Sequence, residues 1–362
     1  MEENNTEYQK QMNDETFASN EPIYETPGVT DTPPQSYVTF VPYGFTPKTY
    51  EEKKSVKKSA LIIGLSLVIM LAITLVWSSI YIFIMGRFGF TADKAYGIIS
   101  DPAVMQVLQI VLSILMFTVP FIIIYKSNGQ RISDLVPLSK PEKGNRLAMF
   151  FIGIAFCSFA NIAVSQASYI FEQFGIDYNV DFGDNPEGFF GFLLSFLATV
   201  VVPGLVEEFA CRGLILGLLR KYGDGFAVLV SAIMFGIMHG NFEQMPFAFL
   251  VGLVLGYIVV QTNSLWIAIA VHATNNFVSV AFDYFLSGFS QSVQNLIYSL
   301  FLAVCLLLGI FALSLNKDKK DLYEFKKSDT ESKMSAKCKW FFTSPVIIIF
   351  VVICVLESLI YF

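Results

Sequence analysis

The segment SALIIGLSLVIMLAITLVWSSIYIFIMG, residues 59–86, runs for 28 residues without one acidic or basic side chain. A second uncharged run covers residues 103–125. An apolar run of about 18 residues or more is long enough to cross the hydrocarbon core of a bilayer as a helix. The two runs therefore predict an all-α protein, a polytopic bundle of transmembrane helices.

The composition of the whole chain agrees with this prediction. Of its 362 residues, 54% are hydrophobic and 15% are charged, whereas soluble domains average about 45–50% and about 25%. This balance excludes a disordered protein, a nucleic-acid-binding protein and an ordinary soluble enzyme. The five cysteines have no paired spacing, and four of them lie in apolar segments. Neither a disulfide framework nor a cysteine-type zinc site is indicated.

Nine apolar segments are candidate membrane helices, so we expect about eight or nine membrane helices in the bundle. One segment, 188–219, is too long for a straight span, and Pro203-Gly204 inside it predicts a kink or a break. The nine segments are 59–85, 103–125, 147–171, 188–219, 225–240, 245–260, 265–285, 293–315 and 341–360.

The chain divides into four expected parts. Residues 1–58 are acidic and contain several prolines, which predicts a disordered tail. Residues 59–144 hold N-terminal membrane helices, 145–290 form a central region, and 291–362 hold C-terminal membrane helices with a lysine-rich loop at 317–339. Lysines cluster directly before the first span, which places the N-terminus in the cytoplasm by the positive-inside rule.

Three ionisable side chains interrupt the segment 188–219. An ionisable residue at the centre of a membrane helix costs about 2.5–3.5 kcal/mol on insertion scales, so it marks a candidate functional site. Glu208 and Arg212 are four residues apart and share a helix face, where they can pair and lower this cost. Glu207 has no such partner, which makes it the better candidate for a free general base.

The only two histidines of the chain both lie in apolar segments. His239 ends the fifth segment, and His272 lies in the seventh, where Asn276 follows it by four residues on the same helix face. At a rise of about 1.5 Å per residue, Glu207 lies roughly 21 Å from Lys221, His239 roughly 21 Å from Gly225, and Asn276 roughly 18 Å from Ser264. We therefore expect these side chains to meet within a turn or two of the same depth.

These residues resemble the motifs of the CAAX protease and bacteriocin-processing (CPBP) family, also called the Abi family of intramembrane glutamic endopeptidases. The family pattern is EExxxR, then FxxxH, then HxxxN on successive membrane helices. The chain has, in that order, Glu207-Glu208 with Arg212, Phe235 with His239, and His272 with Asn276. The resemblance covers roughly 145–285, so 145–290 is expected to be a CPBP-type catalytic core. It departs from the family at Cys211, where members often have an aromatic residue.

The resemblance implies an intramembrane endopeptidase that hydrolyses a peptide bond of a membrane-associated protein or peptide, in CAAX-type or bacteriocin-type processing. It implies a glutamic-type, metal-independent enzyme without a cofactor. The expected partners are the peptide substrate and the lipid bilayer, with no nucleic acid. A bacterial plasma membrane is the expected location.

The resemblance also implies a role for each motif residue. Glu207 and His239 would activate a water molecule, with Glu207 as general base. His272 and Asn276 would donate hydrogen bonds to the oxyanion. Glu208 and Arg212 would support the site by orienting it or by binding the substrate backbone.

Other interpretations stay open on the residues alone. A zinc metallopeptidase would use Glu207, His239 and His272 as ligands, although the HExxH motif is absent. A cysteine protease would use Cys211 with a histidine. A non-catalytic bacteriocin-immunity or membrane scaffold protein would retain the motifs without the reaction, and a transporter is a further alternative.

Overall fold

The computed structural model describes residues 41–141, 146–174, 184–316, 324–325 and 328–359. It divides the chain into two units, 1–55 and 56–362. Throughout the described ranges the secondary structure is helical and no strand occurs, which confirms the all-α class. Residues 1–40 of the expected tail lie outside the described residues. Helix α2 begins at Pro47, so the end of the expected tail 1–58 is helical rather than disordered.

Seven helices within the described ranges are long and apolar enough to cross a membrane. An eighth results if α14 and α15, which meet at an angle of 73°, form one bent span. Helix α10 has 14 residues and is about 21 Å long, which is shorter than the hydrocarbon core of about 30 Å. The seven spans are Pro47–Arg87, Pro102–Ser127, Arg146–Gln173, Gly188–Tyr222, Gln244–Thr262, Leu265–Leu286 and Gln291–Asn316.

The other helices are short. They are α3 (Ala92–Ile99), α5 (Ile132–Leu135), α10 (Asp224–Ile237), α14 (Met334–Phe342) and α15 (Pro345–Leu359). Helix α14 begins inside the expected lysine-rich loop 317–339, of which 317–323 and 326–327 lie outside the described residues. Large apolar side chains such as Phe83, Leu307 and Phe311 are exposed on the long helices, as expected where a helix faces lipid.

The long segment, for which Pro203-Gly204 predicted a kink or a break, is not broken there and forms one continuous run of helical turns that changes its type. It consists of α7 (Gly188–Ser195), the π-helical η2 (Phe196–Val201), α8 (Val202–Glu208), the π-helical η3 (Phe209–Ile215), α9 (Leu216–Leu219) and η4 (Arg220–Tyr222). Two π-helical stretches therefore flank α8. Such turns are rare and are found mostly at functional sites.

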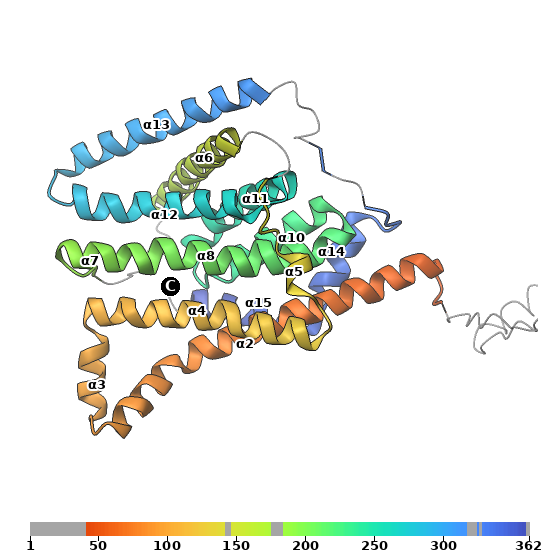
Figure 1. Ribbon diagram of the computed structural model, residues 1–362, viewed down its shortest axis with the longest axis horizontal. Coiled ribbons are helices and arrows are strands. Elements are labelled where there is room, and N and C mark those ends of the chain that lie inside the picture. The colour runs from red at the N-terminus through yellow and green to blue at the C-terminus, as the bar shows by residue number, and fades with distance from the viewer. Residues whose placement is uncertain (1–40, 142–145, 175–183, 317–323, 326–327, 360–362) are drawn as a thin grey trace, which may run out of the picture. The chain divides into compact units, whose positions relative to one another are not determined.

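Helix α8 lies at the centre of the second unit. Figure 1 shows it between α4 (Pro102–Ser127) and α12 (Leu265–Leu286), and both helices contact it. Helix α6 (Arg146–Gln173) packs along α13 (Gln291–Asn316) and also contacts α11 (Gln244–Thr262) and α12. These neighbours bring side chains from distant parts of the chain toward α8.

The close pairing of α10 with α11 depends on a glycine. A Cβ atom placed on Gly252 would lie 3.0 Å from the Ala232 Cα. A larger residue at this position would push the two helices apart. The pairing fixes α10, and with it the turn that carries His239.

Candidate active site

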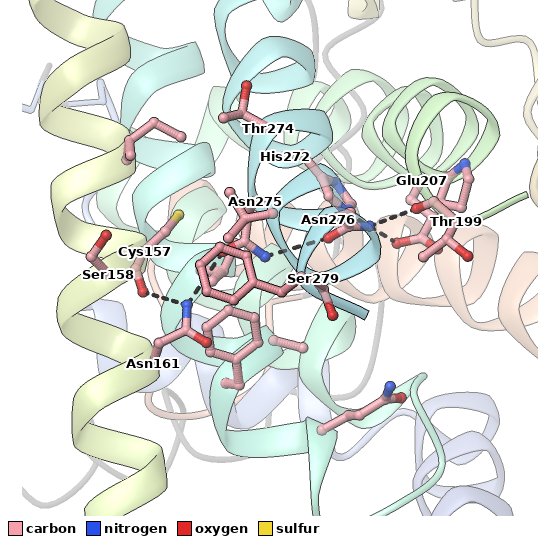
Figure 2. Close-up of a pocket in the computed structure, with 18 of the residues that line it drawn as sticks. Cys157, Ser158, Asn161, Thr199, Glu207, His272, Thr274, Asn275, Asn276 and Ser279 are labelled. Atoms are coloured by element: carbon pink, nitrogen blue, oxygen red, sulfur yellow. Dashed lines mark hydrogen bonds and ion pairs between the residues drawn. The ribbon is translucent and has the colours of Figure 1, made fainter. Parts of the chain in front are cut away.

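One cavity of about 630 Å³ brings the predicted catalytic residues together. It is lined by side chains from α4, α6, α8, α10, α11, α12 and α13, and Figure 2 shows part of this lining. Its lining includes all four candidates, namely Glu207, His239, His272 and Asn276. The expectation that the three motif segments meet is thereby confirmed.

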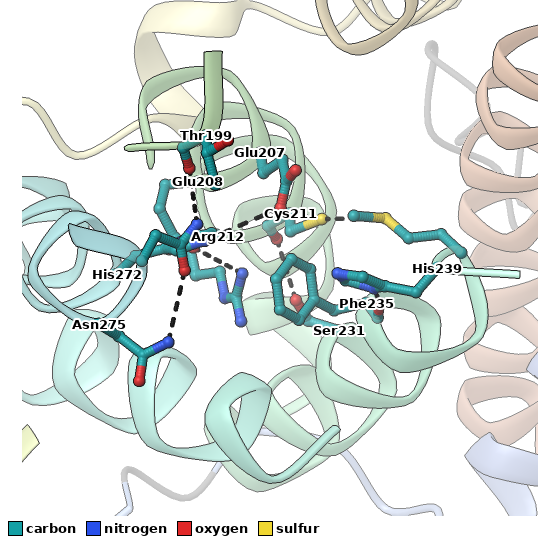
Figure 3. A network of polar contacts seen from close by, with 12 residues as sticks. Thr199, Glu207, Glu208, Cys211, Arg212, Ser231, Phe235, His239, His272 and Asn275 are labelled. Atoms are coloured by element: carbon teal, nitrogen blue, oxygen red, sulfur yellow. Dashed lines mark hydrogen bonds and ion pairs between the residues drawn. The ribbon is translucent and has the colours of Figure 1, made fainter. Parts of the chain in front are cut away.

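Glu208 and Arg212 form the ion pair that their spacing predicts. Arg212 Nη1 donates to Glu208 Oε1 at 2.7 Å, and both side chains are fully buried. The same oxygen, Glu208 Oε1, lies 2.9 Å from His272 Nδ1. Figure 3 shows this cluster of Glu208, Arg212 and His272. Neither Glu208 nor Arg212 lines the cavity, so the cluster reaches it through His272.

The cluster determines where His272 carries its proton. Glu208 Oε1 already accepts a hydrogen bond from Arg212, so it acts as an acceptor toward His272 as well, and Nδ1 is the protonated nitrogen. His272 Nε2 lies 4.0 Å from Glu207 Oε2. This nitrogen offers a lone pair in the neutral ring and an N–H donor in the doubly protonated ring.

His239 follows α10 and has a different partner. Its Nδ1 lies 2.7 Å from the Phe235 carbonyl oxygen. A carbonyl oxygen can only accept, so Nδ1 carries a proton and Nε2 is free to accept a hydrogen bond in the neutral ring. His239 lines the cavity together with Glu207.

Phe235 joins the two histidines to the ion pair. The Arg212 guanidinium lies over its ring, 4.0 Å from the centroid. The ring also meets His239 and His272 edge-on, with centroids 5.0 Å and 5.9 Å away. A cation over an aromatic face is attracted to it, so Phe235 offers buried Arg212 a partner in addition to Glu208.

Asn276 makes a hydrogen bond across to the helix that carries Glu207. Its Nδ2 donates to the Thr199 carbonyl oxygen at 2.9 Å. Thr199 belongs to the π-helical η2. The hydrogen bond therefore links α12 to η2.

Sequence analysis missed three residues of this site. Asn161 on α6 and Asn275 on α12 line the cavity, as does Thr199, and a chain of amides connects them to Asn276. A polar side chain in the apolar segment 147–171 was the available signal for Asn161. No sequence motif connects that side chain to α12.

The cavity lining has further polar groups. Gln109, Asp283 and Tyr298 line it, together with Phe282 and Phe301. Among the lining residues that the structure describes, none is a lysine or arginine. The cavity is thus partly apolar, with its carboxylates at Glu207 and Asp283.

The residues required by two alternative mechanisms are also described. Cys211 is fully buried, and its Sγ lies 3.8 Å from Met238 Sδ rather than beside a histidine. In the described part of the chain, no group of three histidine, cysteine, aspartate or glutamate side chains is placed to hold a metal ion.

A comparison with protein families matches residues 189–278 to the family described as type II CAAX prenyl endopeptidase Rce1-like. The matched region runs from α7 into α12 and includes every motif residue from Glu207 to Asn276. Searches of curated proteins and of solved structures gave no significant match. The chain is thus an integral membrane protein whose residues 189–278 are similar to the type II CAAX prenyl endopeptidase Rce1-like family, consistent with its resemblance to the CPBP family.

Proposed function

We propose that this protein is a glutamic-type intramembrane endopeptidase in which Glu207 activates a water molecule. The observation that carries the proposal is the shared cavity of Glu207, His239, His272 and Asn276. Within it, Glu207 is separated from the buried ion pair that holds the neighbouring carboxylate. Glu207 faces a cavity with no lysine or arginine among its described lining residues, and a carboxylate in such a place is suited to accept a proton.

In the first step, a water molecule lies between Glu207 and His239. The Glu207 carboxylate takes one proton, while His239 Nε2 accepts a hydrogen bond from the other. The water oxygen bonds to the carbonyl carbon of the substrate peptide, whose oxygen becomes an oxyanion. His239 is oriented for this role by its Nδ1–H, which donates to the Phe235 carbonyl.

In the second step, the peptide C–N bond breaks. The oxyanion receives hydrogen bonds from Asn276 Nδ2 and from His272 Nε2 in the doubly protonated ring, which Glu208 stabilises through Nδ1. Glu207 passes its proton to the leaving nitrogen, so the products are a carboxylic acid and an amine. Glu208 and Arg212 orient His272 and do not contact the peptide, because both are fully buried outside the cavity lining.

We propose a membrane-associated peptide as the substrate, with a prenylated C-terminal CAAX peptide as the first choice. The matched family is described as a prenyl endopeptidase. The cavity is also lined by Phe247, Phe282 and Phe301, which suits a partly apolar ligand.

The test uses the full chain reconstituted in liposomes with a fluorogenic CAAX peptide, prenylated or not. The wild type is expected to cleave it, whereas Glu207→Ala and His239→Ala lose most of the activity. Glu187→Ala is the matched control, since Glu187 is exposed at the start of α7. Normal cleavage by both site variants would overturn the mechanism. Equal cleavage of both peptides would remove the prenyl group as a requirement.

A further inference from the structure

A chain of three asparagine side chains runs from α6 to the site. Asn161 Nδ2 donates to the Cys157 carbonyl oxygen at 3.0 Å and to Asn275 Oδ1 at 3.3 Å. Asn275 Nδ2 donates to Asn276 Oδ1 at 3.4 Å, and Asn276 Nδ2 donates to the Thr199 carbonyl oxygen at 2.9 Å. Figure 2 shows this path along one wall of the cavity.

Both ends of the chain are backbone carbonyl oxygens, which can only accept hydrogen bonds. The Thr199 end requires the NH₂ group of Asn276, and the Cys157 end requires the NH₂ group of Asn161. Each amide between these ends must therefore point its nitrogen toward Thr199. A flipped Asn275 would set two oxygens against each other at Asn276 and two nitrogens against each other at Asn161.

The chain also determines which atom Asn276 offers to the cavity. One Nδ2 proton is used by Thr199, and Oδ1 is occupied by the donor from Asn275. The second Nδ2 proton remains for a ligand in the cavity that Asn276 lines. A flipped amide would present an oxygen there and repel a developing oxyanion.

We propose that Asn161 and Asn275 are positioning residues that fix the Asn276 amide with its donor toward the reacting carbonyl. This inference rests on the proposed role of Asn276 in oxyanion stabilisation. It extends the functional site to α6, outside the region 189–278 that matches the family. Asn161 and Asn275 act through Asn276 and do not contact the reacting atoms.

The substitution Asn275→Asp tests the proposal because it keeps the shape and removes the donor. We expect kcat to fall about 10-fold or more with KM nearly unchanged, since losing an oxyanion donor outright costs about 10²–10³ in kcat. Asn161→Asp, one step further away, is expected to lower kcat by a smaller factor. Asn295→Asp is the control, because Asn295 is exposed on α13. Unchanged kcat in both site variants would overturn the proposal.

A double-mutant cycle separates positioning from a general structural effect. In an Asn276→Ala background the amide to be oriented is absent, so Asn275→Asp and Asn161→Asp are expected to cause no further loss of kcat. Losses that multiply with that of Asn276→Ala would show that the two residues act independently and would overturn the proposal.

A third measurement does not depend on turnover. Solid-state NMR of asparagine-labelled protein in liposomes reports the side-chain ¹⁵N environment of Asn276. Its shift is expected to change in Asn275→Asp and Asn161→Asp but not in Asn295→Asp. If the ¹⁵N shift of Asn276 is the same in Asn275→Asp and Asn161→Asp as in the wild type, the positioning role is overturned. This measurement does not require an active preparation. Activity that persists in Glu207→Ala would instead reject the proposed function and leave the NMR result intact.

Discussion

Glu207 and Glu208 are adjacent in sequence but lie in two different regions of the molecule. The Glu208 side chain is fully buried and bonded to Arg212 and His272. The Glu207 side chain is 16% exposed and lines the cavity. Neighbouring residues on a helix point about 100° apart. A single turn of α8 therefore directs one carboxylate into the closed cluster, which consists of Glu208, Arg212 and His272, and the other into the cavity.

The comparison shows that one buried carboxylate is stabilised by its partners, while the other is available for a reaction. Removing a charge from water is expensive unless a partner and hydrogen bonds compensate it. Glu208 has both, and its oxygen that bonds Arg212 also holds His272. Glu207 has no arginine bonded to it, its Oε2 lies 4.0 Å from His272 Nε2, and it lines a cavity that can admit water. We infer that the first carboxylate orients the site and the second performs the reaction.

The largest expected effect is on the reaction, at Glu207. Glu207→Gln keeps the shape of the side chain and removes the base, so the cleavage rate should fall by about 10³-fold, within the range typical of a general base. The thermal midpoint should stay near that of the wild type, since no buried ion pair is lost. Cleavage assays and thermal melts of the same preparations measure both. An active Glu207→Gln would remove the distinction between the two carboxylates.

The next effect is on stability, at Arg212. Arg212→Ala leaves the Glu208 carboxylate buried without its cation, which should cost about 3–5 kcal/mol of unfolding free energy. Titration with a denaturing detergent measures this loss. The matched comparison is Arg131→Ala, since Arg131 precedes the short helix α5 and is exposed. Equal stability of the two variants would mean that the closed cluster contributes nothing.

A small effect is expected at Cys211, which is fully buried on η3 and does not line the cavity. Cys211→Ala should leave the cleavage rate within about two-fold of the wild type, because its sulfur contacts Met238 rather than a histidine. Initial rates at saturating substrate measure this. A loss comparable to that of Glu207→Gln would favour the cysteine mechanism.

No effect is expected from metal chelation. Exhaustive treatment with phenanthroline and EDTA should leave the rate of the reconstituted protein unchanged, because the proposed water is activated by Glu207 and His239 alone. Loss of activity that zinc restores would replace this mechanism by the metallopeptidase alternative. In that case Glu207, His239 and His272 would be metal ligands rather than a base and hydrogen-bond donors.

Much of the fold could be predicted because apolar runs report directly on membrane helices. The pairing of Glu208 with Arg212 was predictable for a similar reason, since both lie on one helix at a spacing of four residues. The convergence of Glu207, His239 and His272 was also predicted from their depth in the segments.

Other features were not predictable because they depend on contacts between distant segments. The sequence around Pro203 indicated a kink or a break; there is no break, and it did not predict the π-helical turns on both sides of α8. Asn161 reaches Asn275 only because α6 packs against α12. The short length of α10 and the bend between α14 and α15 depend on how these apolar helices end, which hydropathy does not specify.

The hydrogen bond between Asn276 and Thr199 has a consequence for how the protein is assembled. The segment Gly188–Tyr222 is synthesised before α12, so the donor that Thr199 receives from Asn276 arrives later than the acceptor. A side-chain amide without a partner is costly in hydrocarbon, so the Asn276 amide favours the docking of α12 against this segment during insertion. Docking also delivers His272 and Asn276 to Glu207. Under the proposed mechanism, a half-inserted chain therefore has no proteolytic activity, because maturation of the bundle and activation of the enzyme are one event.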